Sequence, residues 1–154
     1  MATLYILCGP SGSGKSTWAT NFIKDKRIAY ISRDNIRLSI ITDEEDYFSH
    51  EKEVFKTFVK AIAYYIANGD DAIADATHLN MFSRCKLIQA LDMYTNDYDI
   101  VYVVFNTDAE TCIERNKARE GRRNVPENII RNMCRDFRIP TKDEDERVKE
   151  IIEV

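Results

Sequence analysis

Residues 9–16 read GPSGSGKS, and this short loop decides the fold class. It satisfies the pattern GxxxxGK[ST], with Gly9, Gly14, Lys15 and Ser16 at the fixed positions. An apolar stretch precedes the loop and a helical stretch follows it, which is the setting in which such a loop binds phosphate. Its glycines allow backbone N–H groups to turn toward phosphate oxygens, and the N-terminus of the helix adds partial positive charge. The loop therefore predicts a nucleotide site.

The residue types in the loop predict how a nucleotide is held. Lys15 should reach the β- and γ-phosphates, and the Ser16 hydroxyl should ligate Mg²⁺. We expect Thr17 to add a contact near the phosphates, and the backbone at Ser11, Gly12 and Ser13 to complete the cradle. The ligand should be ATP or another nucleoside triphosphate, because no stretch reads the base and the choice between ATP and GTP stays open.

Outward from the loop, apolar strands alternate with amphipathic helices. Strands are expected at 3–8, 27–32, 71–75 and 99–105, with 148–154 as a candidate fifth. Helices are expected at 15–23, about 45–68, 82–94, about 108–117 and from about 126. This succession predicts one α/β domain over residues 1–154, a P-loop NTPase of the nucleotide-kinase type. Its parallel sheet of four or five strands should have helices on both faces.

Composition limits the classes of partner. The net charge of −4 argues against a protein that coats long nucleic acid, although it allows one that grips a few nucleotides at an end. No apolar run approaches the roughly 20 residues of a membrane span, so no membrane partner is expected. The four cysteines form no CxxC pair, which favours a reduced, cytoplasmic protein without zinc. The oligomeric state stays open.

The acceptor of a phosphoryl group should lie beyond the carboxyl ends of the strands. The second expected strand runs into SRDNIR (32–37), in which Asp34 and Arg37 are one helical turn apart. An aspartate at this point can accept a hydroxyl proton, and an arginine can hold a phosphoryl group. The alternative is an N-cap aspartate with a surface ion pair.

The third expected strand ends in a second polar loop. Asp75 is placed to help order Mg²⁺ through water or to orient an arginine, with a structural role as the alternative. Thr77 and Asn80 are candidates to line an acceptor channel, and His78 is interpreted as a loop hydrogen-bonding residue. Tyr47 and Phe48 suit stacking on a base, but core packing is the favoured interpretation. We place His50 on the surface.

Four stretches occur together in an order that resembles phage-type polynucleotide 5′-hydroxyl kinase domains. They are GPSGSGKSTWA (9–19), SRDNIR (32–37), THLN (77–80) and ERNKAREGRRNVP (114–126), and a helix ending in MCRDF (133–137) follows. The resemblance extends from the first strand to about Pro140. Many members of that family carry a phosphatase domain with a strand ending in DxDGT, and this chain contains no such segment, so phosphatase activity is not expected.

The resemblance implies roles for particular residues. Asp34 matches the general base that activates the 5′-hydroxyl of DNA or RNA, and Arg37 matches the arginine beside that hydroxyl. The basic stretch at about 115–126 matches a lid. Its clamp for the transferring phosphoryl group is expected at Arg119, with Arg122 and Arg123 as alternatives, and Arg115 is expected on the nucleotide side.

Two other functions remain open on the sequence. The same loop fits a P-loop kinase for a small molecule or a tRNA-linked hydroxyl, such as a nucleoside or sugar acid. It also fits a nucleotide-gated binding protein without catalysis, although such a switch needs no acid and arginine on the acceptor side.

Overall fold

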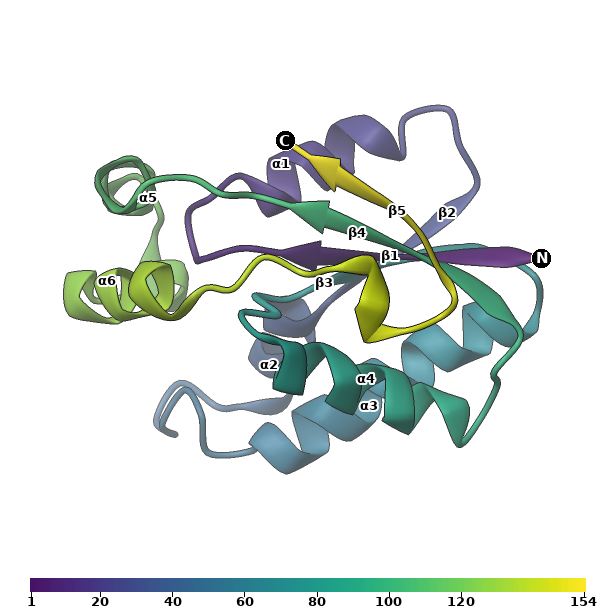
Figure 1. The fold of residues 1–154 in the computed structure, drawn as a ribbon. Helices are drawn as coiled ribbons and strands as arrows, with labels where there is room; N and C mark the ends of the chain where they lie inside the picture. The colour runs from purple at the N-terminus through teal and green to yellow at the C-terminus, as the bar shows by residue number, and fades with distance from the viewer.

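The computed structural model describes all residues 1–154 and contains one five-stranded parallel sheet (Figure 1). The strands are β1 (Ala2–Cys8), β2 (Ile28–Ser32), β3 (Asp71–Asp75), β4 (Tyr98–Val104) and β5 (Val148–Glu153), in the spatial order β2-β3-β1-β4-β5. The central strand is therefore β1, which delivers the glycine loop to the middle of the sheet edge. The candidate fifth strand is confirmed.

Helices cover both faces of the sheet, as expected for parallel strands (Figure 1). On one face lies α1 (Lys15–Phe22), and on the other lie α3 (Glu51–Ala67) and α4 (Met81–Asp92). The larger core cluster includes Leu4, Ile6, Phe58, Ile62 and Leu87 on the α3/α4 face. Alternate residues of the same strands point to the other face, where Leu7 packs in a cluster with Ala19 of α1.

The remaining helices gather at one edge of the sheet. α2 (Arg33–Ile40) follows β2 directly, with its N-cap Ser32 accepting a hydrogen bond from Asn35 N. α5 (Ala109–Lys117) and α6 (Glu127–Asp136) lie beyond the carboxyl ends of β1 and β4 (Figure 1). Residues Gly121–Arg123 form a 3₁₀ turn between α5 and α6. Residues Lys142–Glu144 form a second 3₁₀ turn between α6 and β5. No helix is long and apolar enough to cross a bilayer.

One expected helix boundary is wrong. The helix expected from about residue 45 begins at Glu51, and residues 42–50 form turns. Short local hydrogen bonds explain the difference, because Glu45 accepts from Thr42 N at 2.9 Å and Ser49 Oγ donates to the Asp46 carbonyl at 2.7 Å. Such side-chain bonds to the backbone compete with helix formation.

Candidate active site

A single cleft of about 1080 Å³ opens at the carboxyl edge of the sheet. The glycine loop, α2, the turns before α3, the end of β3 and the segment from α5 to α6 all contribute to its walls. The side chains that line it include Lys15, Ser16, Thr17, Arg33, Asp34, Arg37, Tyr47, Phe48, Glu51, Asp75, Thr77, Arg115, Arg119, Arg122, Arg123, Ile129 and Met133. Segments far apart in the sequence thus meet around one volume.

The glycine loop has the backbone shape that its sequence predicts. Gly12 and Gly14 have φ values of 81° and 102°, which side-chain-bearing residues rarely adopt. Gly14 is the N-cap of α1, so the first N–H groups of that helix lie at the cleft. A β-carbon at Gly12 would lie 2.5 Å from the Cys112 carbonyl oxygen of α5, so the loop packs directly on that helix.

Lys15 is buried at the centre of the loop. Its Nζ donates to the carbonyl oxygens of Gly9 at 2.9 Å and Pro10 at 2.8 Å. Burial lowers the pKa of Lys15, the charges of Asp75 and Asp34 oppose that shift, and the charge of Arg119 adds to it. These three groups therefore lie close enough to the ammonium for their charges to act on it.

Ser16 and Asp75 form a pair of oxygen ligands beside the loop. Ser16 Oγ donates to Asp75 Oδ2 at 2.9 Å, and the Tyr30 hydroxyl donates to the same oxygen. Burial, together with the charge of Asp75, raises the pKa of Tyr30 to about 12, so its hydroxyl stays protonated as a donor. A loop serine next to a strand-end carboxylate is the donor set that holds Mg²⁺ in P-loop proteins. The residues present fit that ion, and Asp75 contacts Ser16 rather than an arginine.

Asp34 and Arg37 face each other on α2. Arg37 Nη1 donates to Asp34 Oδ1 at 2.5 Å, and the Tyr47 hydroxyl donates to the same oxygen at 2.9 Å. The other carboxylate oxygen of Asp34 has no partner in the chain. The predicted one-turn spacing therefore brings the acid and the guanidinium into the cleft together.

The partner of Arg37 on α3 was missed by the sequence analysis. Glu51 accepts from Arg37 Nε at 2.7 Å and from Nη2 at 2.6 Å, a two-point grip on a buried guanidinium. Burial lowers the pKa of Arg37, but the hydrogen bonds to Glu51 and Tyr47, together with the charges of Glu51 and Asp34, outweigh burial and raise the pKa overall. Arg33 shares Glu51 at 3.4 Å. Arg37 and Glu51 are 14 residues apart, a separation that matches neither helical nor strand periodicity. The only signal for this pair in the sequence is the acidic side chain of Glu51.

The favoured core assignment of Tyr47 and Phe48 is wrong. Both residues line the cleft, and Phe48 is 64% exposed. Their rings meet edge to face at 4.9 Å, and the Arg37 guanidinium lies 4.9 Å from the Tyr47 ring and 5.1 Å from the Phe48 ring. The helix that was expected to pack these two rings into the core begins only at Glu51. Tyr47 and Phe48 therefore lie on the turns over residues 42–50. His50 is half-exposed and paired with Glu45.

The arginines of the basic stretch divide into two pairs. Arg122 donates to the carbonyl oxygens of Asp43 and Glu45, and Arg123 donates to Asn35 Oδ1 at 2.5 Å, so both reach across to the α2 side. The guanidinium groups of Arg115 and Arg119 line the cleft and make no hydrogen bond within the chain. Arg115 lies over the glycine loop, with Nη1 3.2 Å from where a β-carbon at Gly14 would stand.

The loop after β3 combines cleft and structural residues. Thr77 lines the cleft, and its carbonyl accepts from Gly9 N at 2.8 Å. His78 is buried with Nδ1 2.7 Å from the Leu7 carbonyl, which fits the expected hydrogen-bonding role. Asn80 caps α4 by accepting from Ser83 N at 2.9 Å and lies outside the cleft lining.

Two loop residues also lie outside the cleft lining. Ser13 has a buried hydroxyl without a partner, and its carbonyl accepts from Thr107. Gly9 packs against Phe105, because a β-carbon there would lie 2.8 Å from the Phe105 Cβ. Their side of the loop therefore faces the protein, while Ser11, Gly12 and Gly14 face the cleft.

Known proteins share this fold. A family model described as an AAA domain matches residues 4–140. A chain of the Pnkp1/Rnl/Hen1 RNA repair complex is 26% identical, with a TM-score of 0.75 over 88% of this chain and 43% of that one. This chain thus spans less than half the length of that repair protein.

Two further solved structures match over nearly the whole chain. A putative kinase from Chloroflexus aurantiacus is 14% identical with a TM-score of 0.76, covering 99% of this chain and 87% of that one. A sugar kinase from Janibacter sp. HTCC2649 is 16% identical with a TM-score of 0.66, covering 99% and 86%. At these identities the likeness concerns the fold alone. The family match, the five-stranded parallel sheet and the glycine loop agree: the chain belongs to the AAA domain family and is a P-loop kinase-like domain.

Proposed function

We propose that the protein transfers the γ-phosphoryl group of ATP to the 5′-hydroxyl end of DNA or RNA. The observation that carries the proposal is the shared cleft, in which Asp34 and Arg37 line the same volume as Lys15 and Ser16. A binding protein gated by nucleotide has no use for an acid and an arginine opposite the phosphate loop. A kinase needs both, one for the acceptor proton and one for charge.

Asp34 acts as the base in this mechanism. Its unpartnered oxygen takes the proton of the 5′-hydroxyl as that oxygen attacks the γ-phosphorus, and Arg37 holds the other oxygen at 2.5 Å. A new P–O bond forms to the acceptor, the bond from the γ-phosphorus to its bridging oxygen breaks, and ADP leaves. The proton passes from Asp34 to solvent afterwards. Holding the hydroxyl next to its base supplies positioning, on which phosphoryl transfer depends.

Cationic groups around the triphosphate neutralise the negative charge of the γ-phosphoryl group while it is transferred. Lys15 serves the β- and γ-phosphates, and Ser16 with Asp75 would hold Mg²⁺, which supplies further charge neutralisation when bound. Among the arginines of the proposed lid, residues 115–126, Arg119 is the clamp for the moving phosphoryl group. Its guanidinium is uncommitted and its charge already acts on Lys15, whereas Arg122 and Arg123 are engaged with the opposite wall. Arg115 lies on the nucleotide side.

The distribution of charge supports a nucleic acid end as the acceptor. The chain carries a net charge of −4, yet Arg33, Arg37 and Arg119 all line one cleft. Concentrated positive charge on an acidic protein suits a polyanion that enters by its end rather than along its length. The 26% identity to a chain of an RNA repair complex points the same way.

Labelled ATP tests the proposal against the small-molecule alternative. The protein is incubated with [γ-³²P]ATP and Mg²⁺, and with 5′-hydroxyl oligonucleotides, nucleosides, sugar acids or buffer alone. We expect label on the oligonucleotides and none on those already 5′-phosphorylated. Label on a nucleoside or sugar acid only would establish the second candidate, and nucleotide binding without transfer would establish a non-catalytic role.

Replacement of Asp34 tests the base. Asp34→Asn should lower kcat by about 100-fold or more, while the Kd for ATP stays near that of the unchanged protein, because the amide cannot take a proton. Asp46→Asn, an exposed aspartate on the neighbouring turns, is the matched control and should leave both constants unchanged. Unaltered turnover in Asp34→Asn would remove this carboxylate from the mechanism.

A further inference from the structure

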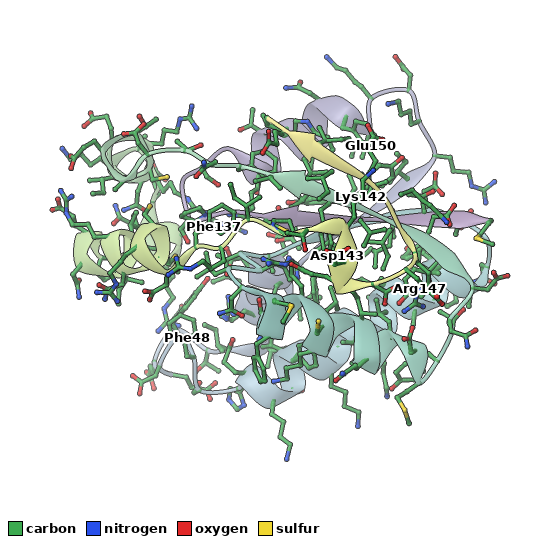
Figure 2. The ribbon with its side chains drawn as sticks, viewed as in Figure 1. Phe48, Phe137, Lys142, Asp143, Arg147 and Glu150 are labelled. Atoms are coloured by element: carbon green, nitrogen blue, oxygen red, sulfur yellow. The ribbon has the colours of Figure 1, made fainter.

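We propose that Phe48 is a stacking platform for the terminal base of the acceptor, an inference that rests on the proposed function. It makes the acceptor one that carries a nucleobase next to the reacting hydroxyl. The observation is an exposed aromatic ring at the mouth of the catalytic cleft, in contact with the arginine on the acceptor side. Figure 2 shows Phe48 on the turns before α3, on the same side of the molecule as α6.

The Phe48 ring lies on a loop that contacts with neighbouring residues hold in place. Arg37 occupies one side of the ring at 5.1 Å and Tyr47 meets it edge-on, while 64% exposure leaves the rest of the side chain open. Arg122 donates to two carbonyl oxygens of the same turns, at Asp43 and Glu45. A large apolar side chain held open to solvent in this way is stabilised by contact with another flat or apolar group.

The position of the ring fits a base rather than another group. The terminal base and the 5′-hydroxyl are attached to the same sugar. A residue that stacks on this base must therefore lie within about the length of one nucleoside from the catalytic acid. Phe48 touches Arg37, and Arg37 bonds to Asp34, which gives that proximity. Stacking on an aromatic ring accepts every base, because each base has a π-face.

Other apolar residues of the cleft also suit a flat, apolar ligand. Ile129 and Met133 of α6 line the same cleft, and Ile129 is partly exposed. The mixture of guanidinium groups for phosphates and an aromatic ring for a base is typical of sites for single-stranded nucleic acid ends.

Two acceptors and three variants test the platform. The acceptors are a 5′-hydroxyl oligonucleotide and the same oligonucleotide with an abasic 5′-terminal residue that keeps its hydroxyl. Phe48→Leu keeps apolar volume without a flat face, and Phe48→Trp keeps the flat face. Phe82→Leu is the matched control, because Phe82 is 77% exposed on α4 and lies outside the cleft.

On the natural oligonucleotide, Phe48→Leu should raise KM about tenfold while kcat changes little, and Phe48→Trp should keep KM near the original value. The abasic acceptor should show a raised KM with the unchanged protein and no further rise with Phe48→Leu. Phe82→Leu should match the unchanged protein on both.

Equal effects of Phe48→Leu on the two acceptors, or no effect on either, would overturn the platform while leaving the kinase proposal intact. A fall in kcat alone would make Phe48 a support for Arg37 and would likewise overturn it. Failure of the unchanged protein to label either oligonucleotide would instead refute the proposed function, and the platform with it.

Discussion

Arg37 is a buried cation whose direction is fixed by one carboxylate. Glu51 binds its Nε and Nη2, which leaves Nη1 to reach Asp34. Arg37 and Arg33 together outweigh the effect of burial and lower the pKa of Glu51, so this carboxylate is charged at neutral pH. The acidic side chain on α3 therefore positions the guanidinium on α2.

Glu51→Gln should lower kcat/KM for the acceptor by about 10- to 100-fold, because a neutral amide cannot hold both nitrogens of the fork. The Kd for ATP should change far less. Glu53→Gln, an exposed neighbour on the same helix, serves as the control and should behave like the unchanged protein. Steady-state kinetics with varied oligonucleotide distinguish these outcomes, and equal kinetics for both variants would show that Arg37 needs no partner on α3.

His78 makes the stability of the fold dependent on pH. Burial lowers its pKa to about 4, and the charges of Arg33, Lys15 and Arg84 add to the shift, while the hydrogen bond to Leu7 opposes it. The unfolded chain binds this proton near pH 6.5 and the folded chain only near pH 4. The stabilising effect of the neutral imidazole is therefore complete above pH 6.5 and is lost as the pH falls toward 4, by a few kcal/mol.

His78→Asn should flatten this acid slope, since asparagine tolerates the positive φ of 42° at this position and does not titrate. Urea unfolding between pH 7 and 4.5 measures the difference. The opposite sign is expected for His50, whose hydrogen bond to Glu45 raises its pKa, so that its contribution is present below pH 6.5 and is lost as the pH rises. Parallel curves for the His78 variant and the unchanged protein would contradict the argument.

At the scale of the element, the glycine loop and α5 form one unit. The Gly12→Ala variant would combine an unfavourable φ of 81° with a β-carbon 2.5 Å from the Cys112 carbonyl oxygen. The backbone of α5 cannot move aside as a flexible side chain can. We therefore expect the variant to lose about 2 kcal/mol or more of unfolding free energy through backbone strain and overpacking. ATP affinity should fall with it.

Gly69→Ala is the matched control for that loss. Gly69 has a φ of 83°, yet a β-carbon there would have nothing within 4 Å. It should cost only about 1 kcal/mol of conformational strain and leave ATP binding unchanged. Urea unfolding and ATP titration of the two variants separate strain from collision, and equal losses in both would show that contact with α5 contributes nothing.

Elements with a strong local signal could be predicted from the sequence. The strand over residues 71–75 falls where its apolar run predicts, and α2 places Asp34 and Arg37 on one turn. The turns over residues 42–50 could not, because their side-chain hydrogen bonds compete with a helical pattern that looks continuous. The pairing of Glu51 with Arg37 could not be predicted for another reason. It depends on how α3 packs against α2, and this packing produces no periodic pattern in the sequence.

At the scale of the whole molecule, one edge of the sheet lines the cleft, and elements away from that edge hold it in place. The segment after α6 crosses back to form β5, and the 3₁₀ turn at Lys142–Glu144 lies on its way, next to α4 (Figure 2). Arg84 of α4 and Glu144 form a two-point ion pair at 2.8 and 2.9 Å, with both side chains buried. Arg84 also donates to the His78 carbonyl at 2.8 Å, which ties the C-terminal segment to the loop after β3.

Removal of one partner of this pair tests how much the C-terminal segment depends on it. Glu144→Gln leaves a buried guanidinium without its counter-charge and should lower the unfolding free energy by about 3–5 kcal/mol. The Arg84→Met/Glu144→Leu double variant should recover most of that loss, because apolar side chains of similar volume avoid the buried charge. Glu114→Gln breaks the exposed pair with Lys117 and should cost under about 1 kcal/mol. Urea unfolding of the three variants gives the comparison, and a Glu144→Gln loss no larger than that of Glu114→Gln would mean that β5 is held by the sheet alone.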